Sequence, residues 1–244
     1  MIKLEKTEVV GWEHAIRGMR NPKNSWDRSD SAHCDVLSCD DCWLGDDLCE
    51  ECDFFAIGPN DHKLMMNLAA GGPVHAKYRR MIAVYVDVTA PLFWWKEYDT
   101  YKVGTVRNSC STMHKIHVKE FEYDDFAHEG IDDVGRDYAF IRDGFLRYIG
   151  NLEVLRNKFN ETQEKRFWRA LIEMLPDGFQ MKATLMLNYE VLAGIYPMRK
   201  NHKLDEWHVF CDWIKSLPYS EIITGPRDGK ALIDGSVNAV EKVK

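Results

Sequence analysis

The sequence predicts an α/β protein, because it combines a clear strand pattern with several amphipathic helices. Residues 81–89 alternate apolar and polar side chains and are rich in β-branched residues, which is typical of a strand. Helical spacing recurs elsewhere, most clearly at Leu204, Trp207, Cys211, Ile214 and Leu217. The 244 residues, of which 45% are hydrophobic, suffice to bury one sizeable core. We expect one domain over residues 1–224, with a Cys-rich insertion at 31–54 and a mobile tail at 225–244.

The first half of the chain predicts a strand that ends near Val10 and a helix that follows it. A loop over residues 21–31 is indicated by its Pro, Asn and Ser content. Asn60 and Asp61 can cap a helix that Gly-Gly-Pro stops at residues 71–73. The strand at 81–89 then leads into a helix that begins after Pro91.

The second half predicts a short strand over residues 114–118 and helices at 137–157, 162–175 and 204–217. Asn160 and Gln163 are spaced as a variant of the capping box that begins the second of these helices. No internal repeat is visible. The second half is therefore expected to be mostly helical.

Charge and hydropathy exclude some classes of protein. The formal net charge of −7 argues against a general nucleic-acid binder, because such binding neutralises phosphates with Lys and Arg. No stretch approaches the roughly 20 apolar residues that cross a bilayer. The N-terminus lacks the apolar core of a signal peptide. We expect a cytoplasmic protein without direct nucleic-acid or membrane binding.

Five of the seven cysteines lie close together, and four of them form two Cys-x-x-Cys pairs six residues apart. These four, Cys39, Cys42, Cys49 and Cys52, can surround one soft divalent ion. Zinc is the prediction, with iron–sulfur or redox-active thiols as alternatives. His33 and Cys34 are spare ligands. A site closed by four thiolates would be structural, because it leaves no open coordination position.

Basic residues before this cluster suggest a second kind of chemistry. Arg17, Arg20, Ser25 and Arg28 can reach a phosphate group. The alternative is that these side chains are simply solvated.

The segment from Leu175 to Trp207 holds the most informative polar spacing. Asn188, Leu192, Ile195 and Arg199 follow one another at helical steps, so an amide and a guanidinium project from one side of a helix. An amphipathic helix with a solvated polar end is the alternative.

This segment resembles the C-terminal signature of the flavin-dependent thymidylate synthases, in which Leu-Pro precedes an Asn-containing helix that ends in Arg. Residues 89–96 resemble that family's strand-to-helix junction, and His75 lies where the family has a His just before its long strand. The resemblance extends over residues 60–218.

The family's central motif, Arg-His-Arg-x-x-Ser-x-Asn-Glu-x-Ser-x-Arg, is eroded at residues 100–114. Asn108 and Ser111 align with its Asn and second Ser when one residue is inserted. Ser109 and Met113 then replace the Glu and the final Arg, while Lys102 preserves one positive charge.

The resemblance implies a small, twisted, mainly antiparallel sheet surrounded by helices, assembled as a homotetramer. It implies a methyltransferase that uses FAD, with NADPH and methylenetetrahydrofolate as cosubstrates. The reaction would add a one-carbon unit to C5 of a pyrimidine deoxynucleotide, either dUMP to dTMP or a related modification.

Seven residues receive roles from this resemblance. Arg199 would bind the pyrimidine and stabilise developing negative charge, Ser111 would orient the nucleotide, and His75 completes the catalytic set. The cofactor-binding residues would be Asn188, Lys102, Asn108 and His202.

The same residues, and the chain as a whole, also have other interpretations. Cys110 is a candidate nucleophile if Arg107 or His114 lowers its pKa, although a small buried Cys is the default. His75 and His202 can also be structural histidines. At the level of the whole chain, the alternatives are an inactive nucleotide-binding or regulatory module and a zinc-stabilised interaction scaffold.

Overall fold

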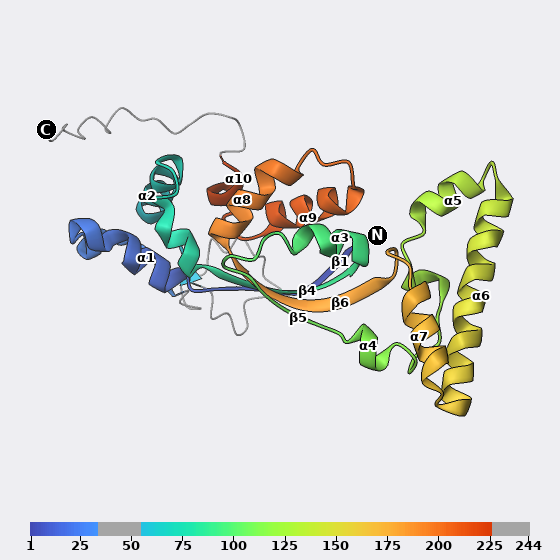
Figure 1. Ribbon diagram of the computed structural model, residues 1–244. Helices are drawn as coiled ribbons and strands as arrows, with labels where there is room; N and C mark the ends of the chain where they lie inside the picture. Colours follow the sequence, from blue (N-terminus) through green and yellow to red (C-terminus); the bar gives the residue numbers. More distant parts are fainter. Residues whose placement is uncertain (34–54, 226–244) are drawn as a thin grey trace, which may run out of the picture. The chain divides into compact units, whose positions relative to one another are not determined.

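The computed structural model describes residues 1–33 and 55–225 (Figure 1). The chain begins with β1 (Lys3–Val10), α1 (Trp12–Arg20), the 3-10 turns η1 (Asn21–Lys23) and η2 (Trp26–Arg28), β2 (Ala32–His33), β3 (Phe55–Ala56) and α2 (Pro59–Ala70). It continues through η5 (Ala76–Met81), β4 (Ala83–Pro91), α3 (Leu92–Tyr98), β5 (Val106–Ser109) and α4 (Thr112–Lys115). The remainder comprises η6 (Tyr123–Asp125), α5 (Glu129–Gly135), α6 (Ala139–Thr162), α7 (Lys165–Met174), β6 (Gln180–Asn188), α8 (Tyr189–Arg199), α9 (Asp205–Ser216) and α10 (Glu221–Thr224).

The sheet has the strand order β1-β4-β6-β5. In β6, Met181, Ala183, Leu185 and Leu187 are buried and alternate with more exposed residues, so this strand has one core face. β5 pairs with β6 in antiparallel register, with Asn108 opposite Thr184. The expectation of helices combined with an antiparallel sheet is confirmed.

The chain forms two compact units. The first unit contains residues 1–7, 85–186 and 202–210, and the second contains residues 8–84, 187–201 and those from 211 onward. β1, β4 and β6 contribute residues to both units. The single domain over residues 1–224 stays a prediction.

Aromatic packing dominates the first unit. Trp94 stacks on Tyr98 with ring centroids 5.2 Å apart and contacts Trp207 at 4.8 Å, and all three are buried. The long helix α6 and helix α7 pack around a separate apolar cluster. That cluster consists of Ile116, Phe121, Phe126, Ile149, Leu152 and Leu171.

The second unit packs α1 and α8 against η5, and α10 against α2 and α8. Trp12 anchors α1 through edge contacts with Tyr189 and Tyr219, whose rings lie 5.2 and 5.3 Å away. Arg79 of η5 donates to Glu190 of α8 over 2.7 Å and to the Ile222 carbonyl over 3.0 Å. These contacts hold the helices of this unit around one core.

Three local predictions are wrong. Asn60 and Asp61 do not cap a helix: they lie in the first turn of α2, which begins at Pro59 after Gly58 as its N-cap. The predicted strand at 114–118 is replaced by α4, because the Ser111 hydroxyl accepts a hydrogen bond from the His114 amide and begins a helix. Gln163 does not begin a helix: it ends α6 with φ of 57°, and its amide donates to the carbonyls of Phe159 and Asn160. Strands β5 and β6 were not predicted.

Within residues 1–33 and 55–225, no helix is both long and apolar enough to cross a membrane. The predicted tail, apart from residue 225, lies outside the described residues.

Gly11 begins α1 in the left-handed region, with φ of 95°, and a Cβ there would lie 2.2 Å from the Met81 carbonyl oxygen. Gly72 has a similar φ of 88° with open space around it. We expect Gly72→Ala to cost about 1 kcal/mol of unfolding free energy from backbone strain alone, and Gly11→Ala about 3 kcal/mol because the clash adds to it. Urea unfolding of both variants measures this difference. Equal losses would contradict the close approach of Gly11 to Met81.

Candidate functional site

A cavity of about 1650 Å³ lies entirely within the second unit. Its lining comes from α1, η1, η2, α2 and η5, together with the loops that join them. The lining carries four cationic residues, Arg20, Lys23, Arg28 and Lys77, and His75 also belongs to it. The apolar part of the lining consists of Met19, Pro22, Leu64, Leu68, Val74, Tyr78 and Met81. The cavity therefore combines positive charge with an apolar surface.

The loop from residue 21 to residue 31 forms one wall of this cavity. Pro22 favours the first turn, and Asn24 takes the left-handed conformation with φ of 47°, which reverses the chain after η1. A loop of this kind has few apolar contacts of its own, so polar contacts must fix its shape.

Arg20 holds the first part of this loop. Its side chain is only 5% exposed, and its guanidinium donates to the carbonyl oxygens of Ser25 and Arg28 over 3.0 and 2.9 Å. Its Nε donates to Oδ1 of Asp61 over 2.6 Å. Arg20 therefore does not offer a free charge to a ligand, and the prediction that it reaches a phosphate is not supported by its contacts.

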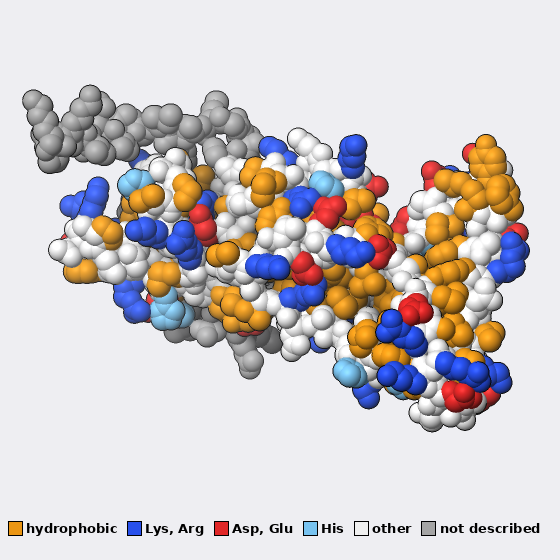
Figure 2. Space-filling view, in the orientation of Figure 1, with side chains coloured by type: hydrophobic (Ala, Val, Ile, Leu, Met, Phe, Trp, Pro, Cys, Tyr) orange, Lys and Arg blue, Asp and Glu red, His pale blue; other side chains and the backbone are white. Residues whose placement is uncertain are grey.

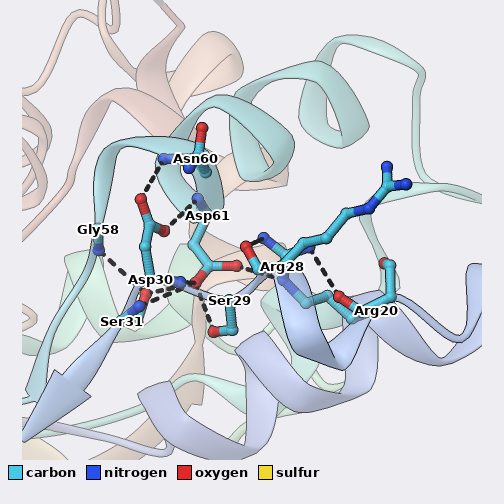
Figure 3. Close-up of polar contacts among 9 residues, drawn as sticks. Arg20, Arg28, Ser29, Asp30, Ser31, Gly58, Asn60 and Asp61 are labelled. Atoms are coloured by element: carbon cyan, nitrogen blue, oxygen red, sulfur yellow. Dashed lines mark hydrogen bonds and ion pairs between the residues drawn. The ribbon is translucent and has the colours of Figure 1, made fainter.

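Asp61, on α2, holds the second part of the loop and is fully buried. Its Oδ2 accepts from the hydroxyls of Ser29 and Ser31, both over 2.7 Å, and from the backbone amides of Asp30 and Ser31 over 3.1 and 3.2 Å (Figure 3). Burial alone raises the pKa of Asp61. The hydrogen bonds from Ser29, Ser31 and Arg20, with the charge of Arg20, outweigh burial and hold the pKa below its usual value.

Asp30 forms a second link between the loop and α2. Its carboxylate accepts from the backbone amides of Asn60 and Asp61 over 2.8 and 3.0 Å, so it satisfies the N-terminus of α2 from a distant loop. The Ser31 hydroxyl also accepts from the Gly58 amide over 3.0 Å. Loop and helix thus fix each other.

Arg28 is placed differently from Arg20. Its backbone carbonyl accepts a hydrogen bond from Arg20, while Figure 3 shows its side chain extending away from the buried carboxylate of Asp61.

Within the described part of the chain, no carboxylate pairs with the side chains of Arg28, Lys23 or Lys77. Asp27 and Asp30 also line the cavity, but Asp30 is occupied by the N-terminus of α2. Figure 2 shows Lys and Arg side chains on the part of the surface formed by α1 and α2. The cavity is suited to an anionic ligand that also has an apolar part.

Of the seven residues predicted from the family resemblance, His75 is the one on this cavity. Asn188 and Arg199 belong to the same unit and lie at the two ends of α8. The Asn188 side chain caps this helix by accepting from the Val191 amide over 3.0 Å, and Arg199 is half-buried. Their roles remain predictions.

The other predicted residues belong to the first unit. Lys102 is exposed in the turn after α3, Asn108 is exposed on β5, and Ser111 caps α4. The Nε2 atom of His202 lies 3.4 Å from a carboxylate oxygen of Glu97. Their binding roles also remain predictions.

Cys110 has an exposed thiol directly after β5. Arg107 is directed elsewhere, since it pairs with Asp99 at 2.9 Å and lies over the Trp95 ring at 5.1 Å. The contacts of Arg107 therefore do not support Cys110 as an activated nucleophile.

Cys39, Cys42, Cys49 and Cys52 lie outside the described residues, as does Cys34. Among the described residues, no group of three or more His, Cys, Asp or Glu side chains is arranged to hold a metal ion. Zinc binding is therefore still a prediction from the cysteine spacing.

Sequence reasoning missed the role of Asp61, which it identified only as a helix cap. Lys23 and Lys77 were not predicted either. The available signal was the density of Ser, Asp and Arg residues between 25 and 31, a composition suited to polar loop contacts.

We expect Asp61→Asn to lower the free energy of unfolding by about 3 kcal/mol at pH 7, because it leaves the Arg20 charge buried without its partner. A lowered folded-state pKa adds stability above the unfolded pKa, near 3.9, and this stability is lost as the pH falls through the folded value. The difference in unfolding free energy between wild type and variant should therefore become smaller below about pH 4. Urea titrations from pH 3 to pH 7 test this, and a gap that stays constant would contradict it.

The sequence matches no protein-family model, and it has no match among curated proteins. Its fold, however, is similar to solved structures. Thymidylate synthase X from Helicobacter pylori, in a structure with FAD and dUMP, aligns with a TM-score of 0.59 and 13% identity over 91% of this chain and 96% of that one. A second structure of that enzyme, described as a flavin-dependent thymidylate synthase, gives a TM-score of 0.59 at 14% identity over 90% and 96% of the two chains.

The UMP/dUMP methylase PolB from Streptomyces cacaoi, bound with 5-Br dUMP, aligns with a TM-score of 0.55 and 12% identity over 92% of this chain and 94% of that one. Likeness at such identity shows the fold alone. The chain therefore has the fold of flavin-dependent thymidylate synthase X and of this methylase.

Proposed function

We propose that this protein is a methyltransferase that uses FAD to transfer a one-carbon unit to C5 of a pyrimidine deoxynucleotide. The observation that carries the proposal is the cavity, where three cationic side chains without a carboxylate partner among the described residues lie beside an apolar lining. The fold is shared with proteins whose structures contain FAD and dUMP, or 5-Br dUMP. A cavity above the roughly 300–1,000 Å³ of ordinary ligand sites also leaves room for a dinucleotide.

The residues on the cavity fit a flavin dinucleotide in their chemistry. Arg28, Lys23 and Lys77 would hold the diphosphate, because cationic donors form strong charge-assisted hydrogen bonds to phosphate oxygens. The apolar side chains would contact a flat ring system. FAD, when bound, supplies the hydride chemistry, and the protein supplies binding and orientation.

The remaining assignments follow from the sequence resemblance. Arg199 would bind the pyrimidine carbonyl and stabilise charge on the ring, and Ser111 would orient the nucleotide. Asn188, Lys102, Asn108 and His202 would contact the cofactor, because the resemblance implies a flavin site built from several subunits. NADPH would supply reducing equivalents, methylenetetrahydrofolate would supply the one-carbon unit, and the active form would be a homotetramer.

Titration with FAD followed by dUMP tests this function by absorbance. We expect FAD to bind, its visible band to shift when dUMP is added, and Arg199→Ala to weaken dUMP binding about tenfold, equivalent to one lost charge-assisted hydrogen bond. Arg166→Gln is the control, since Arg166 is exposed and pairs with Glu164 at the start of α7. If the protein binds no FAD at saturating concentration, the catalytic proposal is wrong. An inactive nucleotide-binding module is then the better account.

We also propose that Cys39, Cys42, Cys49 and Cys52 bind one structural zinc ion. Their spacing supports this, and so does the pairing of β2 with β3, which sets His33 opposite Phe55 and thereby joins the two ends of the Cys-rich segment. Because the two ends of the Cys-rich segment are held together, the four ligands have less distance to cover when they surround one ion.

Elemental analysis should find one zinc per chain, and Cys39→Ser with Cys49→Ser should abolish it, because each pair loses one thiolate. Cys211→Ser is the matched control, since Cys211 is buried in α9. An iron signal with visible absorbance, or a metal-free chain with titratable thiols, would overturn the zinc assignment.

A further inference from the structure

The wall of the cavity that carries Arg28 is held by one buried side chain. Loop 21–31 reaches α2 through Asp61, whose carboxylate accepts five hydrogen bonds from described residues. Four of these bonds come from Ser29, Asp30 and Ser31, which directly follow Arg28 in the chain. The fifth comes from Arg20, which also grips the Arg28 carbonyl. The backbone on both sides of Arg28 is therefore fixed by the same carboxylate.

Arg20 and Arg28 have different roles in the hydrogen-bond network around Asp61. Arg20 is buried, and its charge is balanced by Asp61 over 2.6 Å. Arg28 is exposed on the cavity and, among described residues, has no carboxylate partner. Its guanidinium is therefore available to an anion, and its backbone position is fixed before any ligand arrives. Such preorganisation favours binding, because the loop loses little freedom when the ligand binds.

We propose that Arg28 is the main anion-binding residue of the cavity, with a diphosphate or phosphate group as its ligand, and that Asp61 is a positioning residue that acts through loop 21–31. Lys23 and Lys77 add to the positive charge of the lining. This proposal rests on the proposed function for the identity of the ligand, but its anion chemistry can be tested without a flavin.

The test measures the affinity of inorganic pyrophosphate by calorimetry at 10 °C, with folding verified by circular dichroism. Arg28→Gln should weaken binding about tenfold, because it removes a charge-assisted contact. Arg169→Gln is the matched control: Arg169 is an exposed arginine of α7 in the other unit, where it pairs with Glu173. It should change the affinity less than twofold.

The positioning role needs variants that leave Arg28 intact. Ser29→Ala should weaken pyrophosphate binding several-fold, and Ser29→Thr should restore it, because the hydroxyl that donates to Asp61 returns. Asp61→Asn should weaken it at least tenfold. Glu153→Gln is the structural control, since Glu153 accepts from Arg156 and from the Phe121 amide in the other unit. It should lower stability and leave the affinity unchanged.

Parallel titrations with FAD separate this proposal from the proposed function. FAD binding with unaltered pyrophosphate affinity in Arg28→Gln would overturn the anion site and leave the function standing. Pyrophosphate binding that Arg28→Gln removes, in a protein that binds no FAD, would support the anion site and overturn the function. If Asp61→Asn and Glu153→Gln weaken pyrophosphate binding equally, Asp61 has only a structural role and the positioning proposal fails.

Discussion

The buried carboxylate of Asp61 is the contact on which the cavity depends. A fully buried charge is stable only when a counter-charge and hydrogen bonds replace the water that it loses, and here Arg20 and the loop supply both. The loop in turn gains a fixed shape without an apolar core of its own. The same requirement that keeps Asp61 paired therefore determines where the wall of the cavity lies.

This arrangement explains how a chain with a net charge of −7 can offer a site for an anion. Arg20 and Asp61 cancel each other inside the protein, and Asp30 is taken up by the N-terminus of α2. What remains on the cavity is three cations, Lys23, Arg28 and Lys77, against one carboxylate, Asp27. Local charge, rather than the charge of the whole chain, decides what a site of this size attracts.

Local patterns in the sequence predicted local structure well. The alternation at 81–89 and the apolar spacing of α9 led to correct elements, because each depends on near neighbours in the chain. β6 was not predicted, although Met181, Ala183, Leu185 and Leu187 alternate with more exposed residues as in a strand with one core face. The role of Asp61 could not be read from sequence, since Arg20 is 41 residues away and Ser29 is 32 residues away. His75, which lines the cavity, was predicted only through a family resemblance, and its role stays a prediction.

The measurement that tests this account most directly is amide hydrogen exchange with and without FAD. The account predicts slower exchange in residues 20–31 and 74–81, which form the cavity wall around Arg28 and His75. Unchanged exchange in both segments, with protection confined to residues 99–115 of the other unit, would contradict it.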